Sequence, residues 1–267
     1  MNPDYPNRIV CLTEETTETL YLLGEQDRIV GISGFTVRPR QARREKPRVS
    51  AFISAKIDKI LDLKPDLVIG FSDLQADIAA ELIRAGVNVW LLNHRSVEEI
   101  LSMILQLSAI VGVPEKGKRL VADYIARIEA ASTQAKMLKV KPRVYFEEWD
   151  DPMISGIRWV SELVEIAGGQ DCFPELAAKS HGKDRIIAKG QSVIERNPDI
   201  IIGSWCGKKF RAEKVAARPG WNDINAVRNE QLFEIKSVDI LQPGPAALTD
   251  GLQQMQQIVL DWSREFG

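Results

Sequence analysis

The densest group of ionisable side chains is an acidic run, Glu-Glu-Trp-Asp-Asp, at residues 147–151. Paired carboxylates supply the acid and the base of many proton-transfer enzymes and glycosidases. The run follows a short apolar segment that is typical of a buried strand. Most of its carboxylates are therefore predicted to lie in a solvated turn before a helix, whose N-terminus favours negative charge.

Metal, thiol and nucleotide chemistry find little support in the sequence. The histidines are His94 and His181, and neither stands with cysteines or carboxylates at metal-ligand spacing. Cys206 precedes Lys208 and Lys209, cations of the kind that activate a thiol, but no base or oxyanion motif accompanies it. Glycine-rich nucleotide loops are absent. We therefore expect no metal site, no intrinsic cofactor and no enzymatic activity.

Aromatic side chains follow several predicted strands, although aromatic residues make up only 7% of the chain. Phe35, Phe71, Trp149 and Trp205 each come shortly after an aliphatic run. Ligands of open parallel sheets bind at the carboxyl ends of the strands, and an aromatic ring there covers something apolar. This pattern predicts an apolar ligand, in preference to the alternative that the rings pack one lobe against another. Arg38, in a basic loop, is a candidate contact to an acidic or amide-bearing ligand edge.

The elements that position these residues are short aliphatic strands alternating with helices. Strands without polar alternation are typical of parallel sheets covered on both faces, which predicts an α/β fold. The predicted strands are residues 9–12, 29–32, 67–70, 89–92, 144–146, 200–202 and 232–235, and the predicted helices are residues 16–23, 57–63, 76–85, 97–111, 159–167, 192–197 and 247–264.

The plan of the first half recurs in the second. Segments 56–71 and 190–205 each contain a short amphipathic helix, Pro-Asp, three aliphatic residues and Gly, with Asp66 and Asp199 separated by 199 − 66 = 133 residues. Solenoid periods are only about 20–50 residues, so this spacing indicates a duplicated domain. We predict an N-terminal lobe at 1–113, an interlobe helix at 114–138 and a C-terminal lobe at 139–267, with a ligand in the cleft between the lobes.

Composition excludes several classes of function. A net charge of −2 gives no reason to expect nucleic acid as a partner. No apolar run approaches the roughly 18 residues that span a bilayer, so membrane insertion is not expected. The sequence shows no signal peptide and only three cysteines, which favours the cytoplasm, or the periplasm if a signal was removed. A monomer is expected.

Several longer segments together resemble one family, the solute-binding proteins of cobalamin and ferric-siderophore ABC importers. They are Leu-Gly-x-x-Asp-Arg-Ile-Val-Gly-Ile-Ser (23–33), Lys-Pro-Asp-Leu-Val-Ile-Gly (64–70), Leu-Val-Glu-Ile-Ala-Gly-Gly (163–169), Asn-Pro-Asp-Ile-Ile-Ile (197–202) and Leu-Gln-Pro-Gly-Pro-Ala (241–246). The resemblance implies an α/β fold of two Rossmann-like lobes with parallel sheets joined by one long backbone helix. The similarity is greatest to cobalamin binders, which implies a corrinoid ligand (cobalamin or cobinamide) and an ABC permease partner.

The resemblance also implies a set of ligand-binding positions. These are Phe35, Phe52, Phe71, Glu148, Trp149, Trp205, Trp221, Asp239 and Gln242. Arg38 joins them as a candidate from the basic loop, although most such basic runs are simply solvated. Family members dock onto their permease through one carboxylate on each lobe, and Asp58 occupies that position in the first lobe, whereas the second lobe has Gln191. This departure predicts a cytosolic relative that binds its ligand without feeding a transporter.

Other functions remain open at the level of sequence. A ferric-siderophore or haem binder of the same family is one alternative. A cytosolic enzyme acting on a tetrapyrrole or other metal chelate is another, and it would need Glu147, Glu148 or His94 as its proton acceptor. A protein-interaction module whose partner covers the aromatic side chains is a third.

Overall fold

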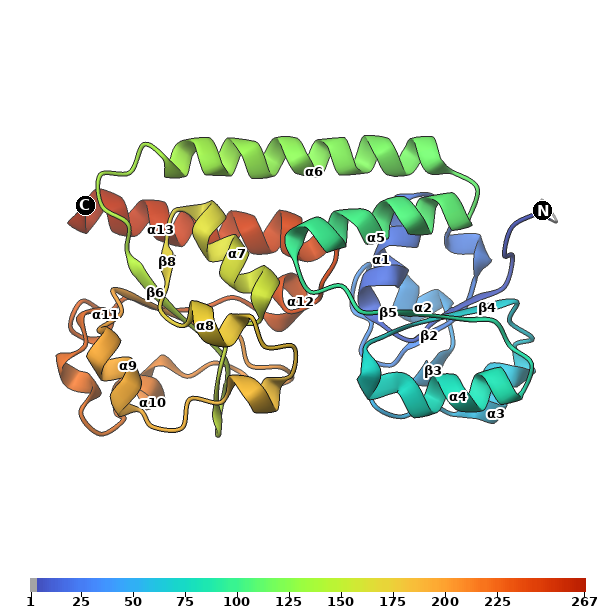
Figure 1. Cartoon of the computed structure of the whole chain (residues 1–267), viewed down its shortest axis with the longest axis horizontal. Helices are drawn as coiled ribbons and strands as arrows, with labels where there is room; N and C mark the ends of the chain where they lie inside the picture. The colour runs from blue at the N-terminus through green and yellow to red at the C-terminus, as the bar shows by residue number, and fades with distance from the viewer. Residues whose placement is uncertain (1–3) are drawn as a thin grey trace. The chain divides into compact units, whose positions relative to one another are not determined.

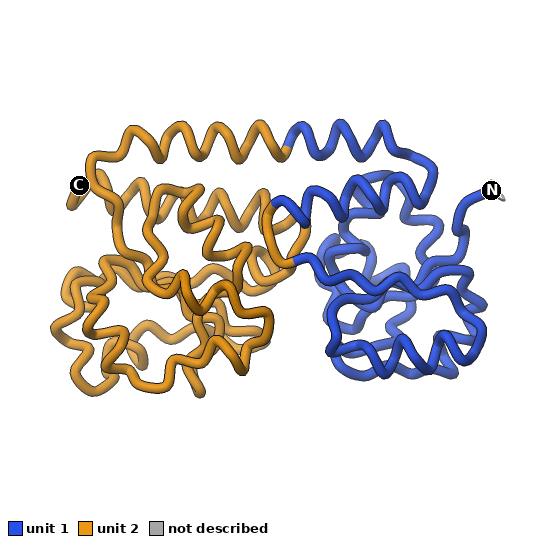
Figure 2. The backbone as a smooth tube through the Cα atoms, viewed as in Figure 1, with its two compact units in different colours: residues 1–94, 98–123 blue, residues 95–97, 124–267 orange. Residues whose placement is uncertain are grey.

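The computed structural model describes residues 4–267 and divides the chain into two compact units (Figure 2). Unit 1 is Met1–His94 with Glu98–Asp123, and unit 2 is Arg95–Val97 with Tyr124–Gly267. The helix predicted within residues 114–138 is present as α6 (Pro114–Ala135), and the division between the units falls inside it. Each unit is an α/β structure, as predicted.

Unit 1 is built on a parallel sheet with the strand order β3-β2-β1-β4-β5. Figure 1 shows helices α1 and α5 on one side of this sheet and α3 and α4 on the other. This two-sided cover explains why the central strands β1 and β4 contain no polar side chain and are buried along their whole length. The elements are β1 (Ile9–Cys11), α1 (Glu14–Leu22), β2 (Ile29–Ser33), α2 (Ala42–Glu45), β3 (Arg48–Ser50), α3 (Ile57–Asp62), β4 (Leu67–Phe71), α4 (Ala76–Arg84), β5 (Val89–Leu92) and α5 (Val97–Ile110), with 3₁₀ turns at Gln26–Arg28 and Asp73–Gln75.

Unit 2 has a sheet with the strand order β10-β9-β6-β7, and β8 pairs with the start of β6. Helices α7 and α13 lie on one side of it and α9, α10 and α11 on the other (Figure 1). The elements are β6 (Arg143–Asp150), β7 (Met153–Ser155), α7 (Arg158–Ala167), β8 (Gln170–Asp171), α8 (Pro174–Ala177), α9 (Gln191–Arg196), β9 (Ile200–Gly203), α10 (Ala212–Ala216), α11 (Asn225–Arg228), β10 (Leu232–Glu234), α12 (Ser237–Ile240) and α13 (Leu252–Phe266), with 3₁₀ turns at Gly182–Arg185 and Trp221–Asp223 and a π-helical turn at Ala247–Gly251.

The prediction that residues 147–151 form a solvated turn before a helix is wrong. Strand β6 continues to Asp150 and pairs with β7 in antiparallel register, so the chain reverses through Asp151 and Pro152. Glu147 is fully buried. The sheet of unit 2 is therefore parallel except at this hairpin, which the acidic composition of the run concealed.

The duplicated segments form the same joint in each unit. In unit 1 the backbone N–H of Arg8 donates to the Asp66 carboxylate (2.9 Å), and the N–H of Asp66 donates to the Arg8 carbonyl (3.0 Å). In unit 2 Arg143 and Asp199 make the same reciprocal pair, over 2.9 and 2.8 Å. The Arg8 and Arg143 side chains also donate to carbonyls at the ends of α3 and α9. The repeat read from the sequence is thus a repeat of structure.

The residue before Pro-Asp adopts the same left-handed backbone in both copies. Lys64 has φ +47° and Asn197 has φ +43°. This conformation is unfavourable for a residue with a Cβ atom, although asparagine tolerates it better than lysine. It lets the chain leave the short helix and enter the next strand, β4 or β9, within a few residues.

The short elements were the ones the sequence did not predict. Strands β3, β7 and β8 contain only two or three residues each, with polar residues among them, so no hydrophobic period can develop. The predicted last helix begins with the π-helical turn, whose last residue is Gly251. Gly251 lies so close to the Asp239 carbonyl that a Cβ atom on it would be 2.5 Å from that oxygen. Within residues 4–267, none of the helices combines the length and the apolar character that crossing a membrane requires.

Candidate ligand-binding site

Apolar side chains are exposed at the carboxyl ends of three strands of the unit 1 sheet, β2, β3 and β4. Phe35 follows β2 and is 54% exposed, Ile53 follows β3 and is 70% exposed, and Leu74 follows β4 and is 51% exposed. Phe52, next to Ile53, is half-buried. We call these four residues the unit 1 rim. Exposed apolar side chains gathered at one edge of a sheet are typical of a surface that binds an apolar partner.

Hydrogen bonds hold the three loops of the rim together. The N–H of Gly34 donates to the Ser50 carbonyl (2.7 Å), which joins the loop after β2 to the end of β3. The Gln75 side chain donates to the Phe52 carbonyl (2.8 Å) and accepts from the N–H of Phe71 (2.9 Å), which joins the loop after β3 to the end of β4. A backbone hydrogen bond and the Gln75 side chain therefore hold the three loops that carry the rim in place without a ligand.

Two further predicted residues of unit 1 are less accessible than the rim. Phe71 is 5% exposed, and its ring meets His94 edge-on with centroids 5.1 Å apart. Arg38 is half-buried and its Nε donates to Glu18 (2.9 Å), so this cation already has an acidic partner. Their assignment to the ligand site stays a prediction.

Helix α1 carries buried carboxyl groups in its first turn. Thr13 is its N-cap residue, but its hydroxyl donates to Glu15 (2.6 Å) and no side-chain capping bond forms. Burial raises the pKa of Glu15 from 4.5 to about 8, against the hydrogen bond from Thr13, which lowers it. The pKa of Glu14 is also raised by burial. At neutral pH Glu15 is thus mainly a neutral acid.

The core of unit 2 contains a buried carboxylate with several donors. Glu147 accepts from both terminal nitrogens of Arg218 (2.6 and 2.9 Å), from the Tyr145 hydroxyl (2.8 Å) and from Nε1 of Trp205 (3.1 Å). Burial and the neighbouring Glu147 raise the pKa of Tyr145. Burial alone would lower the pKa of Arg218, but its hydrogen bonds to Glu147 leave that pKa raised. The group is a structural clamp, since every oxygen of Glu147 is taken.

Two of the three tryptophans predicted to line the ligand site in unit 2 lie in its core. Trp205 is 3% exposed and packs edge-on against Phe210, and Trp221 is 1% exposed and packs edge-on against Tyr145. The cluster they join includes Phe173. Neither ring offers a free face to a ligand in this structure, and their assignment stays a prediction.

The β6–β7 hairpin holds Glu148 and Trp149 in fixed positions. Arg185, which is 2% exposed, donates to both oxygens of Glu148 over 2.6 and 3.1 Å. Trp149 is half-buried, its Nε1 donates to the Asp151 carbonyl, and Nζ of Lys208 lies 5.3 Å from its ring centroid. Of the aromatic residues predicted to line the site in unit 2, Trp149 keeps the most accessible ring.

The remaining predicted positions lie after β10 and in the short helices. Asp239 in α12 accepts from the Gln254 side chain (3.2 Å), and Gln242 is half-buried just beyond α12. Asp58 and Gln191 are both exposed in the first turns of α3 and α9, so they occupy matching places in the repeat. Within residues 4–267 no group of histidine, cysteine and carboxylate residues is arranged to hold a metal ion.

Ile53 and Leu74 were missed by the sequence reasoning. Leu74 is a single apolar residue in a polar segment and Ile53 belongs to a short loop, so neither carries a periodic signal. Their position next to strand ends was the available clue, and for Ile53 it required β3, which the sequence did not reveal.

Comparison with known proteins identifies the family. The profile of the periplasmic binding protein family matches residues 9–238. A vitamin B12-binding protein of Vibrio parahaemolyticus is 26% identical over 245 residues, covering 90% of this chain and 85% of that protein. An uncharacterized ABC transporter substrate-binding lipoprotein of Bacillus subtilis is 24% identical over 268 residues, covering 95% of this chain and 80% of that protein.

A solved structure supports the same fold. The periplasmic haem-binding protein of Roseiflexus sp. RS-1 superposes with a TM-score of 0.78 at 24% identity, covering 95% of this chain and 99% of that one. These relatives are binding proteins rather than enzymes. The match of the family profile over most of the chain shows that this protein belongs to the periplasmic binding protein family.

Proposed function

We propose that this protein is the solute-binding component of an ABC importer and that its ligand is a corrinoid, cobalamin or cobinamide. The observation that carries the proposal is the unit 1 rim, whose Phe35, Phe52, Ile53 and Leu74 form an apolar surface at the sheet edge where α/β folds bind ligands. A corrin ring is broad and largely flat, so aromatic and aliphatic side chains suit its faces. The similarity to vitamin B12-binding proteins supports this ligand over others.

The proposal assigns the ligand surface of unit 2 to the β6–β7 hairpin and the segment after β10. Trp149 supplies a ring there, and Glu148, Asp239 and Gln242 supply polar groups for the amide arms of a corrinoid. Glu148 is already oriented by Arg185, so its oxygens need no reordering. The metal travels inside the ligand, in agreement with a chain that has only two histidines.

An ABC permease and a periplasmic location go with this proposal, which replaces the expectation of a cytosolic relative that feeds no transporter. The family to which the chain belongs and the similarity to an ABC transporter substrate-binding lipoprotein support both. Asp58 is the exposed carboxylate proposed to meet the permease from unit 1. Gln191 leaves the matching position of unit 2 without charge, so docking is expected to be weaker than with two carboxylates.

Binding is tested by isothermal titration calorimetry of the full chain with cyanocobalamin, dicyanocobinamide, haem and ferric siderophores. The proposal expects a one-to-one complex with a corrinoid at micromolar affinity or better. Saturable binding of haem or a siderophore, with flat isotherms for both corrinoids, would contradict a corrinoid ligand and identify a haem or siderophore binder instead. Turnover of a tetrapyrrole metal complex, followed by absorbance, would instead identify an enzyme.

A further inference from the structure

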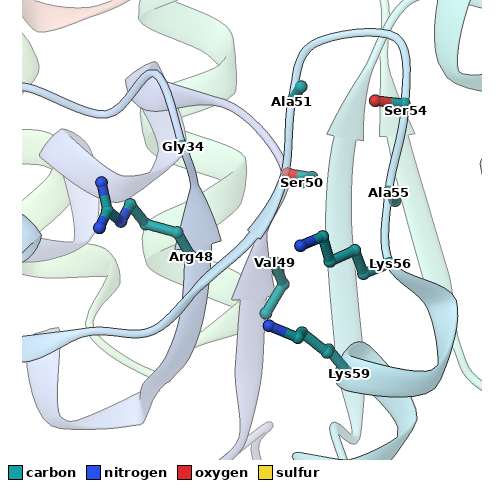
Figure 3. Close-up of a pocket in the computed structure, with 9 residues that line it drawn as sticks. All are labelled: Gly34, Arg48, Val49, Ser50, Ala51, Ser54, Ala55, Lys56 and Lys59. Atoms are coloured by element: carbon teal, nitrogen blue, oxygen red, sulfur yellow. The ribbon is translucent and has the colours of Figure 1, made fainter.

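A cavity of about 490 Å³ opens next to the unit 1 rim (Figure 3). It lies at the carboxyl end of β3, between the end of β2 and the start of α3, and Gly34 and Ser50 form part of its wall. Gly34 directly precedes Phe35, so the cavity adjoins the rim along the chain. This pocket belongs to unit 1 alone.

Three cationic side chains line the cavity, and no carboxylate does. They are Arg48 at the start of β3 and Lys56 and Lys59 at the start of α3. In the part of the chain that the structure describes, none of the three takes part in an ion pair or a side-chain hydrogen bond. Figure 3 shows both lysine side chains reaching toward β3. All three residues are exposed, and Figure 3 shows the Arg48 side chain extending away from the two lysines. Lys56 and Lys59 are therefore the pair of like charges whose repulsion an anion between them would relieve.

A hydroxyl group in the same wall also lacks a partner. Oγ of Ser50 is shielded from solvent and makes no hydrogen bond with any residue in 4–267. An unsatisfied buried hydroxyl costs free energy, and a rotation of the Ser50 side chain that brings it into the pocket would let it donate to a ligand there. The cationic residues in the same lining favour an acceptor that carries negative charge.

The loop around the pocket is already held in shape. The N–H of Lys56 donates to the Val49 carbonyl (2.9 Å), and the N–H of Ala51 donates to the Ser54 carbonyl (2.7 Å). Ser50 and Ala55 pair as an isolated antiparallel bridge. Binding therefore requires ordering of the cationic side chains but not of the backbone.

We infer that this pocket binds an oxyanion, a phosphate or carboxylate group borne by the ligand whose apolar body covers the neighbouring rim. The inference rests on the proposed function for the identity of that ligand. A complete cobalamin carries a phosphodiester in its nucleotide loop, whereas cobinamide lacks it. Haem would bring two propionate carboxylates to the same cations. Lys56 and Lys59 supply point charges to either group, and Arg48 would add a planar, bidentate contact once its side chain turns toward them.

The pocket itself is tested with inorganic phosphate on the ¹⁵N-labelled full chain, at constant ionic strength maintained with chloride. Phosphate is expected to shift the amide signals of Ser50, Ala51, Lys56 and Lys59, and the joint Lys56→Gln, Lys59→Gln variant should lose the response. The matched control carries Lys183→Gln and Lys189→Gln, two exposed lysines of unit 2, and should respond like the wild type. Shifts that are absent, or spread over the chain and unchanged in the Lys56/Lys59 variant, would overturn the inference.

Paired ligands then identify the source of the anion. Cobalamin is expected to bind about tenfold more tightly than cobinamide, the size of one charge-assisted hydrogen bond, and the Lys56/Lys59 variant should bind both equally. A similar preference for haem over its dimethyl ester would assign the site to carboxylates. If cobalamin and cobinamide bind equally and phosphate gives no local response, the pocket does not bind an oxyanion. The proposed function would not be affected by that result. A local phosphate response with no corrinoid binding would support the pocket and contradict the proposed function.

Discussion

Arg218 donates a hydrogen bond from each of its terminal nitrogens to the fully buried carboxylate of Glu147, over 2.6 and 2.9 Å. The pair connects β6 to the segment after α10, residues that are 71 positions apart in the chain. Trp205 and Tyr145 complete the set of donors. A carboxylate this enclosed stabilises the fold of unit 2 and has no position left for a substrate proton.

The variant Glu147→Gln should destabilise the protein by about 3–5 kcal/mol, because it leaves the Arg218 guanidinium partly buried without its counter-charge. Chemical denaturation of the full chain measures this difference. Glu213→Gln is the control, since Glu213 and its partner Arg211 are both exposed and such pairs contribute little. Equal stabilities of the two variants would show that the clamp is not needed.

Much of the fold was predictable because its strands are covered on both faces. A strand such as Val68-Ile69-Gly70 must be apolar at every position, and this signal survives in one sequence. The duplication was visible because both copies keep the residues of one structural joint. Arg8 with Asp66 and Arg143 with Asp199 make the same backbone hydrogen bonds. β3 and the β6–β7 hairpin were hidden because short, polar strands have no period to detect.

The site was less predictable than the fold. Sequence places Trp205 and Trp221 near strand ends, but it cannot say whether a ring turns toward solvent or into the core. In the structure the indole of Trp205 turns inward to reach Glu147, a residue 58 positions away in the chain. Contacts between such distant residues depend on the completed tertiary structure.

Phe35→Ala should weaken corrinoid binding by about tenfold, the scale expected for losing a ring that covers a ligand face. The free energy of unfolding should hardly change, because the ring is 54% exposed. Calorimetric titration and denaturation together separate the two effects. Ile83→Ala, at an exposed position of α4, is the control for loss of an apolar side chain. If both variants bind like the wild type, the rim does not contact the ligand.

Stability should depend on pH through Glu15. Its pKa is about 8 in the folded chain against 4.5 for the free side chain, so the folded state retains the proton more strongly than the unfolded state. Stability is therefore highest below pH 4.5 with respect to this group, and it falls as the pH rises toward 8. Glu15→Gln removes this penalty and should gain on the wild type by about 1 kcal/mol or more between pH 5 and pH 8.

Glu175 provides the contrasting control for that experiment. Burial is the largest single influence and raises its pKa, but the hydrogen bond and the charge of Arg196 together with a backbone hydrogen bond leave the pKa lowered. The stability it contributes is present at high pH and is lost as the pH falls, so Glu175→Gln should lose most relative to the wild type at pH 8. If the free energy of unfolding depends on pH in the same way for Glu15→Gln and the wild type from pH 5 to pH 8, the pKa of Glu15 is not raised in the folded chain.

Lys64→Gly should stabilise the protein by about 1 kcal/mol, because Lys64 has φ +47° and glycine adopts this backbone without a Cβ penalty. The control is Ala130→Gly, at an exposed position inside α6, where glycine should cost about 1 kcal/mol. Thermal denaturation of both variants distinguishes relief of left-handed strain from a general effect of glycine. Destabilisation by both would mean that the Lys64 side chain contributes more than its backbone costs.

Uptake of labelled cobalamin tests docking, in a bacterial strain that lacks its own corrinoid-binding protein and retains the permease. Gln191→Glu should raise uptake, since it supplies the second carboxylate, and Asp58→Asn should lower it. Asp62→Asn is the control, because Asp62 is exposed at the other end of the same helix α3. Uptake by the wild type equal to that of Gln191→Glu would show that one carboxylate suffices.

Hydrogen–deuterium exchange of the full chain with and without cyanocobalamin locates the surface that the ligand covers. Saturating ligand is expected to slow exchange in the loops at residues 34–37, 51–55 and 72–75 and in the β6–β7 hairpin, and to leave α6 and α13 unchanged. Protection confined to other segments, or no protection at any ligand concentration, would contradict a corrinoid site at the carboxyl ends of these strands.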